Sequence, residues 1–210
     1  MRVLVLCGDI FHAVETTRSG LQPLEQHGFE FEYQENVAEI NPSHLKNFPL
    51  VILAKSNVVS RNDQRPWLTS DSEMLFQEHA RNGNGLLVVH SGVVGYKLLP
   101  AVHRIIGGAF VRHPPECEIA IEPRADHPIT NGVMLFPIHD EHYFVQLEED
   151  GPDVFLHSRS EHGVQPAGWT QERKSGRICV LTPGHKIEVW LHPSFQKILL
   201  NASRWAAKIT

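Results

Sequence analysis

Four short apolar runs constrain the fold of this chain more than any other feature. They span residues 2–7, 50–54, 86–89 and 177–181, and each is followed directly by a polar or turn-forming residue. Continuous apolar runs of this length are typical of strands buried on both faces of a parallel sheet. Because helical patterns alternate with these runs in the first half, we predict an α/β fold: a three-layer, doubly wound and mostly parallel sheet.

The other elements follow from apolar periodicity and from residues that start or stop helices. We expect helices at 13–27, 70–81, 95–106 and from 193 onward. Ser70 and Glu73 form a capping-box pattern at the start of the second of these helices. Further strands are expected at 29–33, 118–121, 143–147, 154–158 and 165–170. No repeat or linker interrupts the pattern, so we predict one domain over residues 1–210, with extra strands in its second half.

Composition excludes several classes of function. The formal net charge is −5 and no run of five Lys or Arg residues occurs, so we expect neither nucleic-acid binding nor attachment to an anionic membrane. No apolar stretch approaches the roughly 18 residues of a membrane helix, and the N-terminus does not resemble a signal peptide. The three cysteines are Cys7, Cys117 and Cys179. An odd number at wide spacing favours free thiols, and we expect a cytoplasmic protein.

Histidine is the residue type on which the functional argument depends. Fourteen of the 210 residues are histidine, the commonest metal ligand in proteins. Ligands of open α/β sheets bind outside the carboxyl ends of the strands. His12, His90 and His185 each follow a predicted buried strand, so these three are the first candidates. Four others lie in or beside predicted helices and are expected at the surface: His27, His44, His79 and His103.

The turn after the run 86–89 is a second candidate feature. His90, Ser91 and Gly92 occupy a predicted sharp strand-to-helix turn, the place where α/β-hydrolases expose a nucleophile. Val89 and Val93 stand where the G-x-S-x-G pattern needs glycines. Ser91 as a nucleophile is therefore only an alternative to a structural turn that positions His90.

Residues 139–143 read His-Asp-Glu-His-Tyr and place four metal-binding or proton-transfer groups in five positions. If the chain is extended from Glu141, then Glu141 and Tyr143 share a face that is otherwise apolar, and His142 points the other way. A carboxylate at the rim of a core needs a cation, a metal or hydrogen-bond donors. A solvated acidic turn is the alternative explanation.

His185 and His192 could meet at one ion only if the chain between them bends back, because seven extended residues span ~23 Å. Glu188 lies between them and is a potential carboxylate partner for a histidine. HExxH, GxGxxG and P-loop patterns are missing, and we expect no nucleotide cofactor.

Six short segments occur in a characteristic order. They are 85–92 (GLLVVHSG), 107–110 (GGAF) followed by His113-Pro114, 126–132 (DHPITNG), 140–143 (DEHY), 183–185 (PGH) and 201–206 (NASRWA). Together they resemble ThuA-like (trehalose utilisation) proteins, a branch of the class I glutamine amidotransferase-like fold. The first 80 residues match only in general character. The resemblance implies a flavodoxin-like arrangement of the sheet.

In amidotransferases of this fold the strand-to-helix turn holds a catalytic cysteine. None of the three cysteines of this chain falls on that turn, so we expect no thiolate-dependent glutaminase activity. By the resemblance, His185 falls where the catalytic histidine of the fold lies, and Glu188 falls roughly where its partner lies. Gly184 departs from the usual sequence motif of the amidotransferases at this point.

The resemblance also implies a role in sugar metabolism, on trehalose or keto-sugar derivatives, and a site able to hold a divalent metal. We expect zinc or a similar ion with an open coordination position. The expected catalytic residues are His90, Glu141 and His185; the expected substrate-binding residues are His12, Ser91 and Tyr143; the expected metal ligands are His90, Glu141, His185 and His192. The expected partner is a small sugar, and a homo-oligomer is expected because homodimers are common for this fold class.

Other functions remain open at this point. A hydrolase, lyase or isomerase could work without a metal, with His185 as general base and Glu141 as its electrostatic partner. A non-catalytic ligand-binding or regulatory domain on the same scaffold is the main alternative, because a fold does not fix a function.

Overall fold

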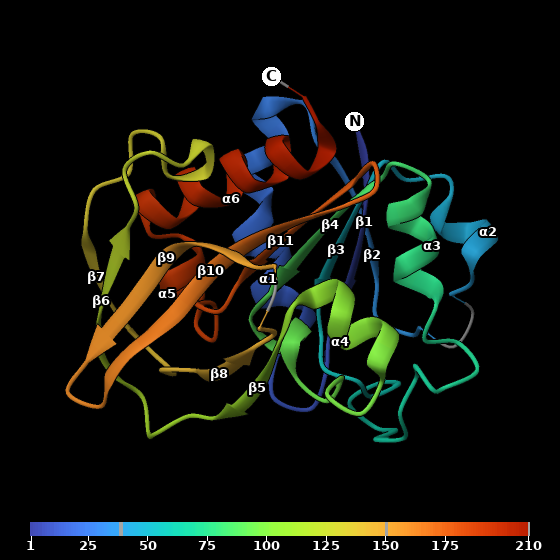
Figure 1. Ribbon diagram of the computed structural model, residues 1–210, viewed down its shortest axis with the longest axis horizontal. Coiled ribbons are helices and arrows are strands. Elements are labelled where there is room, and N and C mark those ends of the chain that lie inside the picture. Colours follow the sequence, from blue (N-terminus) through green and yellow to red (C-terminus); the bar gives the residue numbers. More distant parts are fainter. Residues whose placement is uncertain (38–39, 150, 210) are drawn as a thin grey trace.

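One large mixed sheet organises the chain. The computed structural model describes residues 1–37, 40–149 and 151–209. Within these residues nine strands form the sheet in the order β2-β1-β3-β4-β11-β10-β9-β6-β7 (Figure 1). The strands are β1 (Arg2–Cys7), β2 (Glu30–Gln34), β3 (Leu50–Ala54), β4 (Gly85–Val89), β6 (Cys117–Pro123), β7 (Phe136–Asp140), β9 (Asp153–Ser160), β10 (Gly163–Arg173) and β11 (Gly176–Leu181).

The sheet changes character at β11. Strands β2, β1, β3, β4 and β11 are parallel neighbours, and they include all four apolar runs of the sequence. From β11 through β10, β9, β6 and β7 each pairing is antiparallel. The prediction of a doubly wound α/β sheet with extra strands in the second half is confirmed. The strand order reverses around β1, which places a topological switch point beside the end of that strand.

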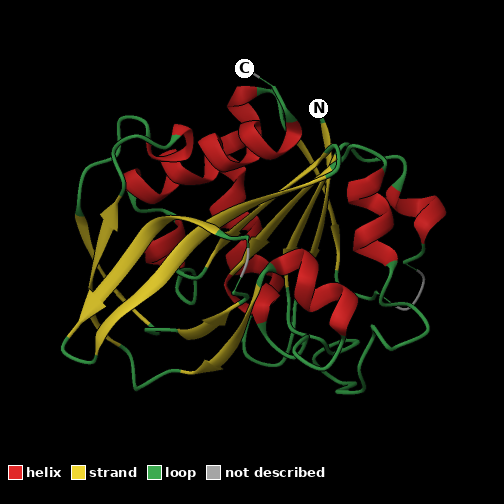
Figure 2. Cartoon of the chain, viewed as in Figure 1, coloured by secondary structure: helices red, strands yellow, loops and turns green. Residues whose placement is uncertain are grey.

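Helices cover both faces of the parallel half (Figure 2). They are α1 (Val14–Leu21), α2 (Pro42–Leu45), α3 (Leu75–Arg81), α4 (Pro100–Ile106), α5 (Ile187–Trp190) and α6 (Pro193–Ala207), with 3₁₀ turns η1 (Gln22–His27), η2 (His90–Val93) and η3 (Pro128–Thr130). Alternate residues of β1 enter two cores: Val3 and Val5 lie in the core that includes α6, and Leu4 and Leu6 in the core that includes α3 and α4. This alternation is why the strand had to be apolar throughout.

Several helices are shorter than the sequence predicts, and prolines explain two of them. The expected helix 13–27 becomes α1 followed by η1, with Pro23 at the start of the 3₁₀ segment. The expected helix 95–106 begins only at Pro100. A proline lacks the N–H that an α-helical interior needs but is well suited to a first turn. The helix predicted from residue 193 is confirmed at its start and runs to Ala207.

The capping box at Ser70 is a wrong prediction. Helix α3 begins at Leu75, and its N-cap, Met74, makes no side-chain cap. The Glu73 carboxylate instead accepts a hydrogen bond from the backbone N–H of Ala101 at the start of α4, at 3.1 Å. The carboxylate therefore satisfies an orphan donor of another helix, which no local pattern encodes.

Two strands were missed in the second half. Strand β7 closes the edge of the large sheet, and β5 (Gly108–Arg112) pairs with β8 (Phe144–Leu147) in a separate two-stranded sheet. The extended run begins at Phe144, so Glu141 and Tyr143 lie in the loop between β7 and β8 and the predicted strand alternation does not apply to them. No helix among the described residues is both long and apolar enough to cross a bilayer.

Candidate functional site

Three histidines meet at the carboxyl ends of the parallel strands. His12 lies in the loop after β1, His90 directly follows β4, and His185 follows β11. This is the edge of the sheet at which open α/β folds bind ligands. The three predicted histidines are therefore brought together by strands that are adjacent or nearly adjacent in the sheet.

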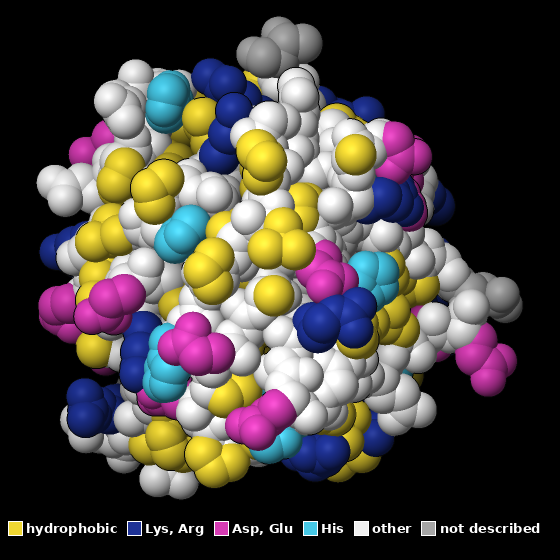
Figure 3. Space-filling model, turned by 90° about the vertical axis from the view of Figure 1, so that its left-hand side faces the viewer, with side chains coloured by type: hydrophobic (Ala, Val, Ile, Leu, Met, Phe, Trp, Pro, Cys, Tyr) yellow, Lys and Arg dark blue, Asp and Glu magenta, His cyan; other side chains and the backbone are white. Residues whose placement is uncertain are grey.

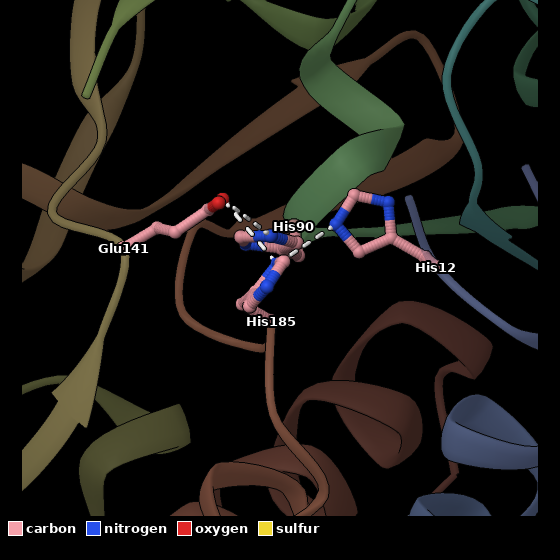
Figure 4. A group of neighbouring side chains, drawn as sticks. All are labelled: His12, His90, Glu141 and His185. Atoms are coloured by element: carbon pink, nitrogen blue, oxygen red, sulfur yellow. Dashed lines mark hydrogen bonds and ion pairs between the residues drawn. The ribbon is translucent and has the colours of Figure 1, made fainter. Parts of the chain in front are cut away.

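The fourth member of the cluster comes from the antiparallel half. Glu141, in the loop between β7 and β8, points toward the three imidazoles from the opposite side (Figure 4). One ligand atom from each of the four residues lies within 4.8 Å of all the others. We call these four residues the His/Glu cluster. His90 is 2% exposed, and the Glu141 and His185 side chains are 14% and 22% exposed.

Three of the six distances among the four ligand atoms match the edges of a tetrahedral metal site, and the remaining pairs lie within 4.8 Å. The His12 Nε2 atom lies 3.2 Å from His185 Nδ1. The Glu141 Oε2 atom lies 3.4 Å from His90 Nε2 and 3.4 Å from His185 Nδ1. A tetrahedron with zinc–nitrogen bonds of about 2.0–2.1 Å has edges of about 3.4 Å. Three imidazole nitrogens and one carboxylate oxygen also form a donor set that suits zinc.

The outer nitrogens of these histidines are held by acceptors. The Asp9 carboxylate accepts a hydrogen bond from His12 Nδ1 at 2.8 Å, and the Thr182 carbonyl accepts one from His90 Nδ1 at 2.8 Å. A carbonyl or carboxylate can only accept, so Nδ1 carries a proton in both rings, and in the neutral imidazole Nε2 then offers its lone pair to the centre. Such outer partners orient metal-binding histidines in general.

The pKa values of His185 and Glu141 are both lowered by their surroundings. Burial lowers the pKa of His185, and the charge of Glu141 only partly offsets this. Burial acts to raise the pKa of Glu141, but the neighbouring His90, His185 and His113 side chains outweigh it, so this pKa lies below its usual value. Neutral imidazole and ionised carboxylate are the forms that bind a metal.

The turn after β4 is strained at His90. This residue has φ = 48°, a left-handed conformation that non-glycine residues adopt rarely and at a cost of about 1–3 kcal/mol. His90, and not Ser91, therefore occupies the strained position of the elbow. Ser91 is buried beside it, lining a space of only about 10 Å³ together with His12 and His90.

Two of the three cysteines are unsuited to nucleophilic chemistry. Cys7 and Cys179 are fully buried. Burial raises the pKa of Cys7 to about 12 and raises that of Cys179 as well. A thiol that stays protonated is a poor nucleophile.

Tyr143 contacts the cluster through its hydroxyl group. The hydroxyl lies 3.1 Å from His90 Nε2, and the two rings stack with centroids 4.4 Å apart. Burial, together with the charges of Glu141 and Asp140, raises the pKa of Tyr143 far above its usual value. The phenol therefore stays protonated and acts as a hydrogen-bond donor.

His192 is not where the sequence placed it. It lies outside the His/Glu cluster, and His12, expected only to bind substrate, takes the fourth position. The His192 Nδ1 atom accepts a hydrogen bond from the Ser194 N–H as the N-cap of α6, and its ring stacks on Phe136. The chain bends after His185, but the short helix α5 carries His192 away from the cluster. Glu188, in that helix, is exposed.

Sequence reasoning missed the outer partners of the cluster. Asp9 lies two residues after the end of β1 and is buried. Burial would raise its pKa, but hydrogen bonds from His12 and from backbone N–H groups lower it. His113 and Glu116 reach the cluster from the loop between β5 and β6. The position of Asp9 after a buried strand was an available signal. The loop residues His113 and Glu116 carried no such signal, apart from the match of His113 to a motif of the family.

A cavity opens next to helix α5, and none of the four cluster residues lines it. It has a volume of about 350 Å³ and is lined by Ile138, His139, Lys186, Glu188, Val189 and His192. Lys186 is the neighbour of His185 in the chain. The face of the molecule at the β6–β7 end of the sheet shows acidic, basic and histidine side chains among apolar ones (Figure 3).

Several solved structures share the fold of this chain. A ThuA-like protein from Parabacteroides merdae superimposes with a TM-score of 0.77 at 17% identity, covering 99% of this chain and 90% of that one. A cytoplasmic protein from Salmonella typhimurium gives 0.68 at 12% identity, with 98% of each chain covered. A glutamine amidotransferase from Thermotoga maritima gives 0.63 at 12% identity, covering 99% and 98%. These likenesses show the fold.

The family follows from the sequence profile. No curated protein matches the chain. The profile of the ThuA family, described as trehalose utilisation, matches residues 2–206, which is nearly the whole chain. The chain therefore belongs to the ThuA family.

Proposed function

We propose that this chain is a metal-dependent enzyme that acts on a sugar or keto-sugar derivative as a hydrolase, lyase or isomerase. The observation that carries the proposal is the convergence of four ligand atoms within 4.8 Å of one another, with the outer nitrogens of His12 and His90 already held by acceptors. The sugar class is supported by the trehalose-utilisation description of the family.

The residues of the site divide into metal ligands and a proton donor. His12, His90, Glu141 and His185 would hold zinc or a similar ion. When bound, such an ion supplies Lewis acidity that polarises a carbonyl or activates a water. The Tyr143 hydroxyl lies against His90 Nε2. With this nitrogen bound to a metal, the phenol would be free to donate its proton to a substrate oxygen.

The rest of the substrate is proposed to lie in the cavity next to α5, which Lys186, the residue after His185, helps to line. Its volume of about 350 Å³ falls within the usual range for small-molecule sites. Lys186 and Glu188 offer a donor and an acceptor to hydroxyl groups, while Ile138 and Val189 supply apolar surface. A mixture of this kind suits a polyhydroxylated molecule better than a strongly charged one.

A metal-free site is the second candidate. The 3.2 Å contact between His12 Nε2 and His185 Nδ1 supports it, because a protonated His185 Nδ1 can donate to the unprotonated His12 nitrogen. His185, kept neutral by burial, would then act as a general base with Glu141 as its electrostatic partner.

Metal analysis of protein purified without a histidine tag tests the proposal. We expect about one equivalent of divalent ion per chain, removable by a chelator and restored by zinc, manganese or cobalt. Protein that holds no ion and cannot be loaded would leave the metal-free candidate. Turnover of any member of a panel of keto-sugars and phospho-sugars would separate an enzyme from a ligand-binding domain.

A cytoplasmic location is proposed as well, since two Salmonella typhimurium proteins of this fold are described as cytoplasmic. The homo-oligomer stays a prediction.

A further inference from the structure

The segment His113-Pro114-Pro115-Glu116 lies against the outside of the His/Glu cluster. It belongs to the loop that connects β5 to β6. Its two consecutive prolines restrict the backbone between the two polar residues. The His113 Nδ1 atom also donates a hydrogen bond to the Pro114 carbonyl, at 2.8 Å. The segment therefore presents His113 and Glu116 from a constrained backbone.

Glu116 supplies what His185 otherwise lacks. His12 and His90 face the centre through Nε2, whereas His185 faces it through Nδ1. Its outer nitrogen is therefore Nε2, and the Glu116 Oε1 atom lies 3.6 Å from it. An imidazole that binds through Nδ1 carries its proton on Nε2, where a carboxylate is a good acceptor. With Glu116, all three outer nitrogens face an acceptor.

Glu116 is itself fixed from the far side. The Lys186 ammonium group donates to Glu116 Oε2, and His139 Nδ1 lies 3.6 Å from the same oxygen. This leaves Oε1 directed at His185. The neighbour of His185 in the chain thus anchors the carboxylate that orients the imidazole.

The other end of the segment contacts the carboxylate ligand. The His113 Nε2 atom lies 3.6 Å from Glu141 Oε1, whereas Glu141 Oε2 faces His90 and His185. One oxygen of Glu141 therefore faces His113 on the outer side, and the other is directed inward.

We propose that the 113–116 segment is the outer clamp of the metal centre, in which Glu116 is a positioning residue that holds His185 with Nδ1 inward and His113 orients Glu141. The inference rests on the proposed metal function. The clamp comes from the antiparallel extension of the sheet, so the site is completed by a segment far in sequence from the strands that carry the histidines.

Cobalt binding to the full chain tests the clamp. For Glu116→Ala we expect a Co²⁺ dissociation constant about 10–100-fold above that of the wild type, together with an altered visible absorption of the bound ion. Glu116→Gln should recover most of the affinity because its amide oxygen still accepts from Nε2. Lys186→Met should give a smaller loss than Glu116→Ala.

A matched control exists on the neighbouring strand. Glu122 is also a glutamate in an ion pair, with Arg159, and its side chain is 31% exposed against 32% for Glu116. Glu122→Ala should leave both the dissociation constant and the cobalt spectrum unchanged. Thermal unfolding of the metal-free variants checks that both remain folded.

The outcomes are distinct. If the wild type binds no Co²⁺, the proposed metal function and the clamp fail together. If the wild type binds Co²⁺ and Glu116→Ala matches it in affinity and spectrum, only the clamp is overturned. An equal loss in Glu116→Ala and Glu122→Ala would also overturn it, since the effect would then be a general one of removing a surface ion pair.

Discussion

Buried histidines lie at both ends of the parallel strands, and the two ends use them differently. At the amino end, His79 of α3 is 3% exposed and its Nε2 donates to the Gly85 carbonyl at 3.1 Å. Within the described part of the chain its Nδ1 has no hydrogen-bond partner. At the carboxyl end, the nitrogens of His12, His90 and His185 face one another. The sequence predicted a surface position for His79, and that prediction is wrong.

The comparison separates burial from function. His79 packs as a neutral core residue, and burial lowers its pKa to about 4. Single buried histidines of this kind are structural. The carboxyl end differs because several strands end side by side there, so side chains from distant parts of the chain converge with their outer nitrogens already held.

The largest expected effect is the loss of metal on removing an inner histidine. His90→Ala or His185→Ala should weaken zinc binding by more than the roughly 10–100-fold that an outer partner costs. His79→Gln should leave zinc affinity unchanged. Competition with a chromogenic chelator measures all three. Equal affinity in His90→Ala and the wild type would remove the distinction between the two ends of the sheet.

The amino end should instead control stability against acid. The pKa of His79 is lowered from 6.5 to about 4, so the unfolded chain binds a proton first as the pH falls. The contribution of neutral His79 to the free energy of unfolding is therefore complete above pH 6.5 and is lost as the pH falls toward 4. The loss is about 3 kcal/mol at most. Urea unfolding of metal-free wild type and His79→Gln should show this pH dependence in their difference. A difference that is constant from pH 4 to 7 would contradict it.

An outer partner should have an intermediate effect. Asp9→Asn weakens the hold on His12 Nδ1 and should reduce zinc affinity by about 10–100-fold. The Asp9 carboxylate also accepts hydrogen bonds from the backbone N–H groups of His12 and Ser56. Folding of the variant should therefore be checked by circular dichroism. A folded Asp9→Asn protein with wild-type affinity would show that His12 is not positioned through Asp9.

The smallest effect is expected at His192. Because His192 caps α6 and stacks on Phe136, His192→Ala should lower the free energy of unfolding by about 1–2 kcal/mol. Zinc affinity should not change, since His192 lies outside the cluster. A loss of zinc comparable to that of His185→Ala would restore the ligand set that the sequence predicted.

Sequence reasoning located most of the site because the ends of buried strands can be predicted from a sequence. Each of His12, His90 and His185 follows a buried apolar run, and parallel strands bring their carboxyl ends to one edge. Glu141 was selected for another reason, as a carboxylate that would need a partner. The prediction of His192 as a metal ligand failed because the path of the chain from His185 to His192 depends on the short helix α5, which the sequence of those residues did not predict.

The sequence by itself determined the parallel half of the sheet, the histidine-bearing strand ends and the absence of a cysteine at the elbow, because burial periodicity and residue chemistry are local properties. Only the tertiary structure decided that His12 replaces His192, that His185 faces the centre through Nδ1, and that Asp9 and Glu116 hold the rings from outside. These features depend on distances between segments up to 173 residues apart. Side-chain direction at such distances is fixed by packing, which no local pattern records.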